Sequence, residues 1–137
     1  MKIKFQINSV PNEDQKQYLI AYLEGVFKIF LMEKLFFHSS EILLAELGVS
    51  LKKWINNIKS GNFGDFHYET MESDENPIIS FEYNGKGGFI VKSPWSEFEA
   101  TEPIGQNELI IEVEAFLERL NLKLNEKCKV KLEELIQ

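Results

Sequence analysis

The chain opens with a strict alternation of apolar and polar residues. Ile3, Phe5 and Ile7 are separated by Lys4 and Gln6, and this period of two is typical of a strand that buries one face. The sequence PNED that follows is a turn signal. The pattern therefore predicts a strand at the start of the chain.

The next apolar stretch, YLIAYLEGVFKIFLMEKLFF, fits two periods. It contains a helical stripe, with Asn12 or Asp14 as the N-cap, but every second residue from Leu19 to Leu31 also belongs to one face without polar side chains. Gly25 would cost a helix interior about 1 kcal/mol, and VFKIF is rich in strand-forming residue types. We therefore predict a long strand over residues 18–32 that turns at the Glu-Lys pair after it.

Residues 40–60 carry the apolar stripe of a central helix. Leucines, Trp54 and isoleucine recur every three or four positions, which places them on one helix face. Ser39 and Ser40 are the expected N-caps, and Gly61 is the expected stop. Trp54 is expected in the core.

Three short strands should follow this helix, because the loops ESDENP and NGKGG are rich in turn residues. The strands are expected over Phe66–Met71, Ile78–Tyr83 and Phe89–Ser93, in antiparallel order. A last apolar stripe without Gly or Pro predicts a long C-terminal helix over residues 107–135, with Cys128 on its buried side. We expect a single α+β domain, residues 1–137, in which an antiparallel sheet of about five to six strands carries both helices.

The composition agrees with a soluble domain. The 137 residues are 44% hydrophobic, which is enough for a core that needs no disulfide or metal to stabilise it. The one cysteine excludes an internal disulfide. No stretch offers about 20 mostly apolar residues for a membrane span, and the N-terminus lacks the apolar centre of a signal peptide. We expect a cytoplasmic protein without a membrane partner, and its oligomeric state, monomer or homodimer, stays open.

The net charge of −7 is concentrated in the middle of the chain. Residues 60–118 hold thirteen Asp and Glu against two lysines, whereas the rest holds nine acids and thirteen bases. This middle lacks the basic footprint of a nucleic-acid-binding protein. A solvated acidic face is one interpretation, and a surface that attracts a basic protein partner is the other.

The candidate partner-binding residues lie in two acidic segments around a tryptophan. We expect Trp95 and Phe98 to be mainly buried, with Trp95 as a possible anchor, since tryptophan is enriched at binding hot spots. The candidates are Glu69, Glu72, Asp74, Glu75, Trp95, Glu97, Glu99 and Glu102.

Asp65, His67 and Glu69 alternate in DFHYE and would project from one face of a strand. One histidine and two carboxylates are a partial metal or acid–base set, but successive side chains on a strand face are about 7 Å apart. The pattern fits equally the outer face of a strand that buries Phe66 and Tyr68. A ligand-binding or metal-dependent enzyme with these three residues is the alternative function.

A module that dimerises through the C-terminal helix is a third possibility. The lysines of that helix are expected on a solvated face, because stacking partners for nucleic-acid bases are missing. We assign no catalytic residue, cofactor or metal.

From residue 22 to 118 the chain resembles a group of small uncharacterised bacterial domains. Their pattern is a Leu- and Glu-rich helix ending in Trp, then Gly, DF-Y, an acidic loop, an apolar strand and S-W; here its points are Trp54, Gly61, Asp65, Phe66, Tyr68 and Trp95. In size and character the chain is also similar to immunity proteins that neutralise bacterial toxins. The resemblance implies a non-enzymatic binding protein and favours the strand over residues 18–32.

Overall fold

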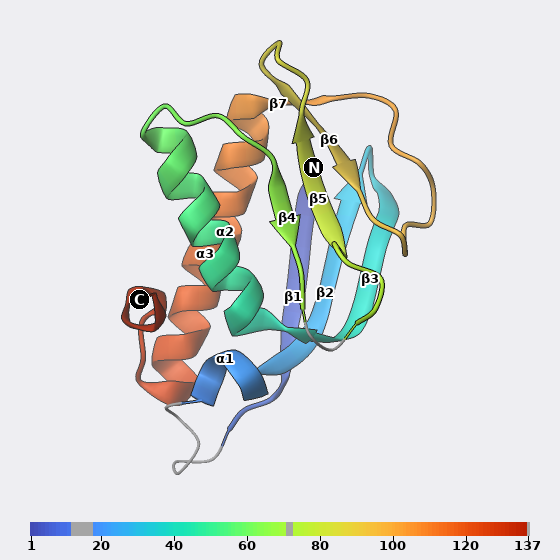
Figure 1. Ribbon diagram of the computed structural model, residues 1–137. Coiled ribbons are helices and arrows are strands. Elements are labelled where there is room, and N and C mark those ends of the chain that lie inside the picture. The colour runs from blue at the N-terminus through green and yellow to red at the C-terminus, as the bar shows by residue number, and fades with distance from the viewer. Residues whose placement is uncertain (12–17, 71–72, 137) are drawn as a thin grey trace.

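The strands form two separate antiparallel sheets in the computed structural model, which describes residues 1–11, 18–70 and 73–136 (Figure 1). The first sheet has the order β1-β2-β3, with β1 at Lys2–Ser9, β2 at Glu24–Leu31 and β3 at Lys34–Leu43. The second has the order β4-β5-β6-β7, with β4 at Phe66–Tyr68, β5 at Ile79–Tyr83, β6 at Gly88–Lys92 and β7 at Ile104–Gly105.

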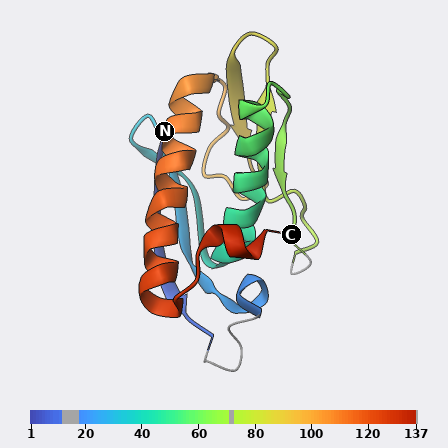
Figure 2. The same cartoon turned by 90° about the vertical axis from the view of Figure 1, so that its left-hand side faces the viewer.

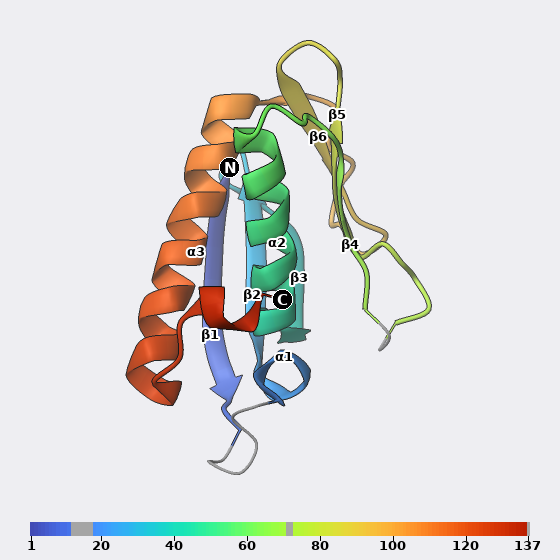
Figure 3. The same cartoon turned by 60° about the vertical axis from the view of Figure 1, so that its left-hand side comes forward.

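Two long helices lie side by side on one face of the first sheet (Figure 2). They are α2, Leu44–Lys59, and α3, Gln106–Cys128; the short α1, Leu19–Tyr22, and the 3-10 turn η2, Leu132–Leu135, lie at their ends. The second sheet lies on the other side of α2 (Figure 3). Phe116 of α3 packs edge-on against Phe5 and Phe27 of the first sheet, with ring centroids 5.3 Å apart in both cases.

The prediction of one sheet of five to six strands is wrong, and α2 supplies the physical reason. Its buried residues include Leu51 on the predicted stripe and Val49 on the opposite side of the helix, so a single flat sheet would leave part of this apolar surface exposed. Trp54 faces the second sheet, where its ring lies 5.4 Å from Phe81 and 5.5 Å from Phe89. The α+β class is confirmed, but two sheets share the central helix.

The prediction of one strand over residues 18–32 holds only from Glu24 onward. Glu24 pairs with Ser9 of β1 and with Leu43 of β3, and both ladders end there. Residues 19–23 therefore have no neighbouring strand. Their backbone groups form hydrogen bonds within α1 instead, where the Leu23 N–H donates to the Leu19 carbonyl at 3.0 Å. The predicted turn after β2 is confirmed. Asn12 and Asp14, the alternative N-caps, lie outside the described residues.

Ser39 and Ser40 are not helix caps, since both lie within β3. The strand continues because its partner β2 continues, and Ser39 pairs with Phe27. The helix begins at Leu44 without a side-chain cap. Its first N–H instead donates to the Leu23 carbonyl at 2.9 Å, which satisfies a backbone donor that a capping side chain would otherwise take.

The C-terminal helix ends at Cys128 instead of residue 135. Lys129 has a left-handed backbone, with φ of 58°, and the chain folds back so that Leu132 packs on α2. The Leu132 N–H donates to Asn121 Oδ1 at 2.6 Å. The apolar spacing continues past Cys128, but its last members contact a different helix. Cys128 is buried, as predicted.

The three short strands after α2 are confirmed. The first two are shorter than predicted, and the third begins and ends one residue earlier; Met71, the expected end of the first, lies outside the described residues. The glycines of NGKGG form the expected hairpin turn, with positive φ at Gly85 and Gly87. Gly61 follows the end of α2 with φ of 88°. The two-residue β7 was not foreseen. Among the described residues, no helix is long and apolar enough to cross a membrane.

Candidate functional site

The candidate binding residues lie in two connections of the second sheet. Glu69, Asp74 and Glu75 belong to the connection from β4 to β5. The connection from β6 to β7 carries Trp95, Glu97, Glu99 and Glu102. Every candidate carboxylate among the described residues is exposed. Glu72 lies outside the described residues.

A hydrogen bond from Trp95 joins these two connections. The indole Nε1 of Trp95 donates to Glu75 Oε2 at 3.0 Å, and its ring stacks on Phe37 of β3 with centroids 6.2 Å apart and planes 15° from parallel. The adjacency of the two acidic segments at this point was not evident from the sequence, because twenty residues separate the two partners.

Trp95 is 38% exposed, so the expectation that it would be mainly buried is wrong. The reason is local. After Pro94 the chain turns, with the Trp95 N–H donating to Ser93 Oγ at 3.0 Å, and then runs beside β3. The ring stacks on Phe37 and stays partly exposed. Phe98 is half-buried against Phe36, at 5.4 Å between centroids.

The connection from β6 to β7 is held to the first sheet by its backbone. The Glu97 N–H donates to the Phe36 carbonyl at 2.8 Å. This bond bridges the two sheets and fixes the direction of the segment that carries Glu97, Glu99 and Glu102. The carboxylates therefore stand on an anchored segment.

A hollow of about 390 Å³ lies between this segment and strands β5 and β6. Its polar lining includes Ser80, Glu82, Lys92 and Glu99. Lys92 Nζ lies 2.9 Å from Glu82 Oε1, and the hydrogen bond and charge of Glu82 raise the pKa of the Lys92 ammonium, with a smaller contribution from Glu99. Lys92 is thus engaged mainly by Glu82.

Asp65, His67 and Glu69 lie on the solvent side of β4 and the residues that flank it. All three are exposed while Phe66 and Tyr68 between them are buried, which confirms the alternation. Asp65 Oδ1 accepts from the Tyr83 N–H at 2.8 Å, a role in holding the sheet. No three His, Cys, Asp or Glu side chains within residues 1–11, 18–70 and 73–136 could hold a metal ion together.

Trp54 and the apolar stripe of α3 are both buried. Trp54 is a core residue with 6% exposure, and its Nε1 donates to the Gly64 carbonyl at 3.0 Å. The apolar stripe of α3 is buried inside the fold. Its residues are Leu109, Val113, Phe116, Leu117, Leu120, Leu124 and Cys128. That stripe is therefore occupied by the chain's own core.

Sequence reasoning missed one group of charged residues. The lysines of β1 and the basic side chains in the second half of α3 lie beside one groove, although more than a hundred residues separate them along the chain. A count of charges per segment does not show that these two groups of basic residues lie close together in the fold. Only the packing of α3 along β1 brings them together.

Comparison with protein families identifies the chain's relatives. The family model described as Domain of unknown function (DUF7878) matches residues 1–126, so the chain belongs to this family. No curated protein and no solved structure matches the chain significantly.

Proposed function

We propose that this member of the DUF7878 family is a non-enzymatic binding module, of the bacterial immunity or inhibitor type, that holds a basic protein partner in the cytoplasm. The contact region is its acidic surface, which we define as Trp95 with the carboxylates of Glu69, Asp74, Glu75, Glu97, Glu99 and Glu102. Glu72 belongs to the same set by sequence.

The observation that carries this proposal is the hydrogen bond between Trp95 and Glu75. It places a half-exposed, rigidly stacked indole between two segments of exposed carboxylates. Binding hot spots are enriched in tryptophan and are surrounded by polar residues that exclude water. An anchor with a charged rim is the arrangement that such a site requires.

The physical basis of recognition is charge complementarity. A toxin that acts on nucleic acid must be positively charged where it binds phosphates, and a surface of carboxylates can occupy that region. Such pairs associate rapidly at low salt, and the rate falls as salt screens the charges. The connection between β6 and β7 is already anchored to β3, so little ordering is needed on binding.

The test compares two charge reversals of equal size. In the first, Glu97, Glu99 and Glu102 are each replaced by Lys; in the control, the exposed Glu118, Glu126 and Glu134 of α3 and the C-terminal segment are replaced likewise. Both change the formal net charge from −7 to −1. Proteins retained from native cell extract at low salt are identified, and association rates are measured with the purified partner over a series of salt concentrations.

We expect the first variant to associate at least about tenfold more slowly and with a weaker salt dependence, while the control changes far less. Trp95→Ala should weaken the complex by about 2 kcal/mol or more. It should also lower the thermal midpoint, because the indole stacks on the buried Phe37, so binding is measured well below the midpoint of the variant. Equal association rates for the two triple variants, or a partner without a basic surface, would remove the proposal.

A further inference from the structure

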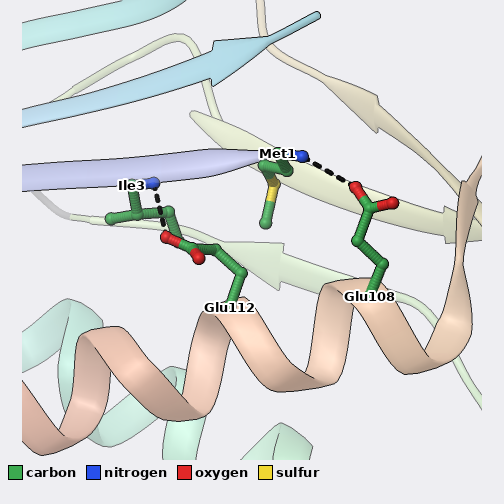
Figure 4. A network of polar contacts seen from close by, with 4 residues as sticks. All are labelled: Met1, Ile3, Glu108 and Glu112. Carbon is green, nitrogen blue, oxygen red and sulfur yellow. Dashed lines mark hydrogen bonds and ion pairs between the residues drawn. The ribbon is translucent and has the colours of Figure 1, made fainter.

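β1 is an edge strand. Its outward backbone groups are bonded at one end of the strand, which we call the closed end, and have no partner among the described residues toward the other end, which we call the open edge. β1 pairs only with β2 in the order β1-β2-β3, so the other side of its backbone faces α3. Figure 4 shows the closed end: the Ile3 N–H donates to Glu112 Oε2, and the terminal ammonium of Met1 contacts Glu108 Oε2, both at 2.7 Å. Arg119 Nη2 also donates to the Ile3 carbonyl at 2.9 Å.

These contacts establish which backbone groups point outward. In an antiparallel ladder, alternate residues direct their N–H and C=O to the partner strand and away from it. Because Ile3 points away from β2, Phe5 and Ile7 do so as well. From the described residues outside the sheet, no hydrogen bond reaches the backbone of Phe5 or Ile7. Two consecutive outward positions are therefore free to bond an added strand.

A groove of about 900 Å³ runs beside this open edge. One wall is β1, and the other is the second half of α3, including Arg119, Leu122, Lys123 and Lys127. Leu122 is 65% exposed and supplies an apolar contact. Among the described residues that line the groove, Glu126 is the one acid, and it is paired with Lys123 at 3.7 Å. The groove is therefore basic, in a chain whose net charge is −7.

The positive charge continues across the open face of the first sheet. Lys4 is paired with Lys28 of β2, so two lysines stand side by side in a row, and the next residue of the row is His38 of β3. No carboxylate of a described residue lies within ion-pair distance of Lys4 or Lys28. Like charges directly opposite destabilise a sheet, and an anion above the row would relieve this repulsion.

We propose that the β1 edge from Lys4 to Ile7 binds an extended acidic peptide segment of a protein partner, which adds to the sheet as a fourth strand. Backbone bonds to Phe5 and Ile7 would supply the strand pairing. Alternate side chains of the peptide would point to the two faces of the sheet. The acidic side chains would face Lys2 and Lys4, and the aliphatic side chains would face Leu122. The site lies apart from the acidic surface and takes a ligand of opposite charge.

Charge complementarity favours an acidic strand over a second copy of β1 as the occupant. In a symmetric antiparallel pairing about Phe5, Lys4 would lie opposite Gln6 of the copy and would gain no opposite charge, and lysines on an edge strand are a known device against self-association. An acidic strand supplies the opposite charge. Alternation of acid and aliphatic residues is thus the sequence pattern that fits both walls of the groove.

The probe is an acetylated heptapeptide of alternating glutamate and valine, titrated into the ¹⁵N-labelled full chain. We expect shift changes at residues 4–7 and slower hydrogen exchange of the Phe5 and Ile7 amides, with no gain at Ile3, whose N–H is already bonded. Lys4→Glu with Lys127→Glu should weaken binding at least tenfold. The control, Lys53→Glu with Lys86→Glu, makes the same charge change at exposed positions away from the groove and should alter binding less than twofold.

The binding of three comparison ligands tests the proposal further. The same composition arranged as four glutamates then three valines, and the alternating peptide N-methylated at every second residue, should both bind at least tenfold more weakly. Equal binding by either would mean that charge alone acts, without strand addition. Tighter binding by oligothymidylate than by the acidic peptide would identify a nucleic-acid surface and overturn the inference.

Discussion

Replacing Gly25 by Ala should destabilise this fold more than any other single methyl addition at its glycines. Gly25 is buried in the central strand β2, where β1 and the start of α2 both approach it. A methyl carbon there would lie 2.1 Å from the Gln6 carbonyl oxygen and 2.6 Å from Leu44 Cδ1. Both distances are far below van der Waals contact.

The magnitude follows from what must move. Gln6 is part of the β1–β2 ladder, so relief of the closer contact requires a backbone shift of more than an ångström in a paired strand. Overpacking of a core typically costs 1–3 kcal/mol and more where backbone must move, so we expect a loss of about 3 kcal/mol or more. For a chain of this size each kcal/mol corresponds to about 3–5 °C, which gives a thermal midpoint lower by roughly 10 °C.

Urea and thermal denaturation followed by circular dichroism measure this loss. Gly64→Ala is the matched control, because nothing lies within 4 Å of its added methyl carbon, and it should stay within about 0.5 kcal/mol of the parent. Gly48→Ala should fall between the two, since its methyl meets only side-chain ends, those of Leu120 at 2.6 Å and Leu132 at 3.3 Å, and α2 gains helix propensity. A Gly25→Ala variant within 1 kcal/mol of the parent would refute the reasoning.

Three further predictions test the packing and charge of the second sheet. Trp54→Ala should cost about 3–5 kcal/mol in urea denaturation, because its ring joins α2 to three phenylalanines; a loss below 2 would contradict this role. Tyr68→Phe should cost about 1–2 kcal/mol, since its hydroxyl donates to an α2 carboxylate at 2.7 Å; an unchanged stability would contradict it. Glu82→Gln should lower the pKa of Lys92 in an NMR titration toward its ordinary value, whereas Glu102→Gln should leave it unchanged. In the parent, the Lys92–Glu82 attraction persists below the raised pKa of Lys92 and is lost as the pH rises through it.

Much of the local structure was predictable because it depends on neighbours in sequence. The alternation in β1 places Ile3 toward the core and Lys4 on the open face, as a period of two requires. The hairpin at NGKGG follows from glycines that accept positive φ. Burial of Trp54 follows from its place on a helical stripe. In each case the determining pattern spans only a few residues.

The errors at helix and strand ends share a different origin. Ser39 and Ser40 carry side chains suited to capping, yet they lie in β3 because β2 offers a partner along that length. Residues 19–22 have the alternation of a strand but no strand beside them, so they form a helical turn. Pairing between distant segments overrides local preference wherever backbone groups must be satisfied.

The sequence by itself determined the α+β class, the order of most elements, and the concentration of acids in residues 60–118. Only the tertiary structure decided that α2 is shared by two sheets, that Trp95 remains half-exposed beside Glu75, and that Lys4 lies across a groove from Lys127. The physical reason is the distance along the chain over which each effect acts. Periodicity and turn chemistry act within a few residues, whereas burial of a helix on two sides and the grouping of charges depend on which distant segments pack together.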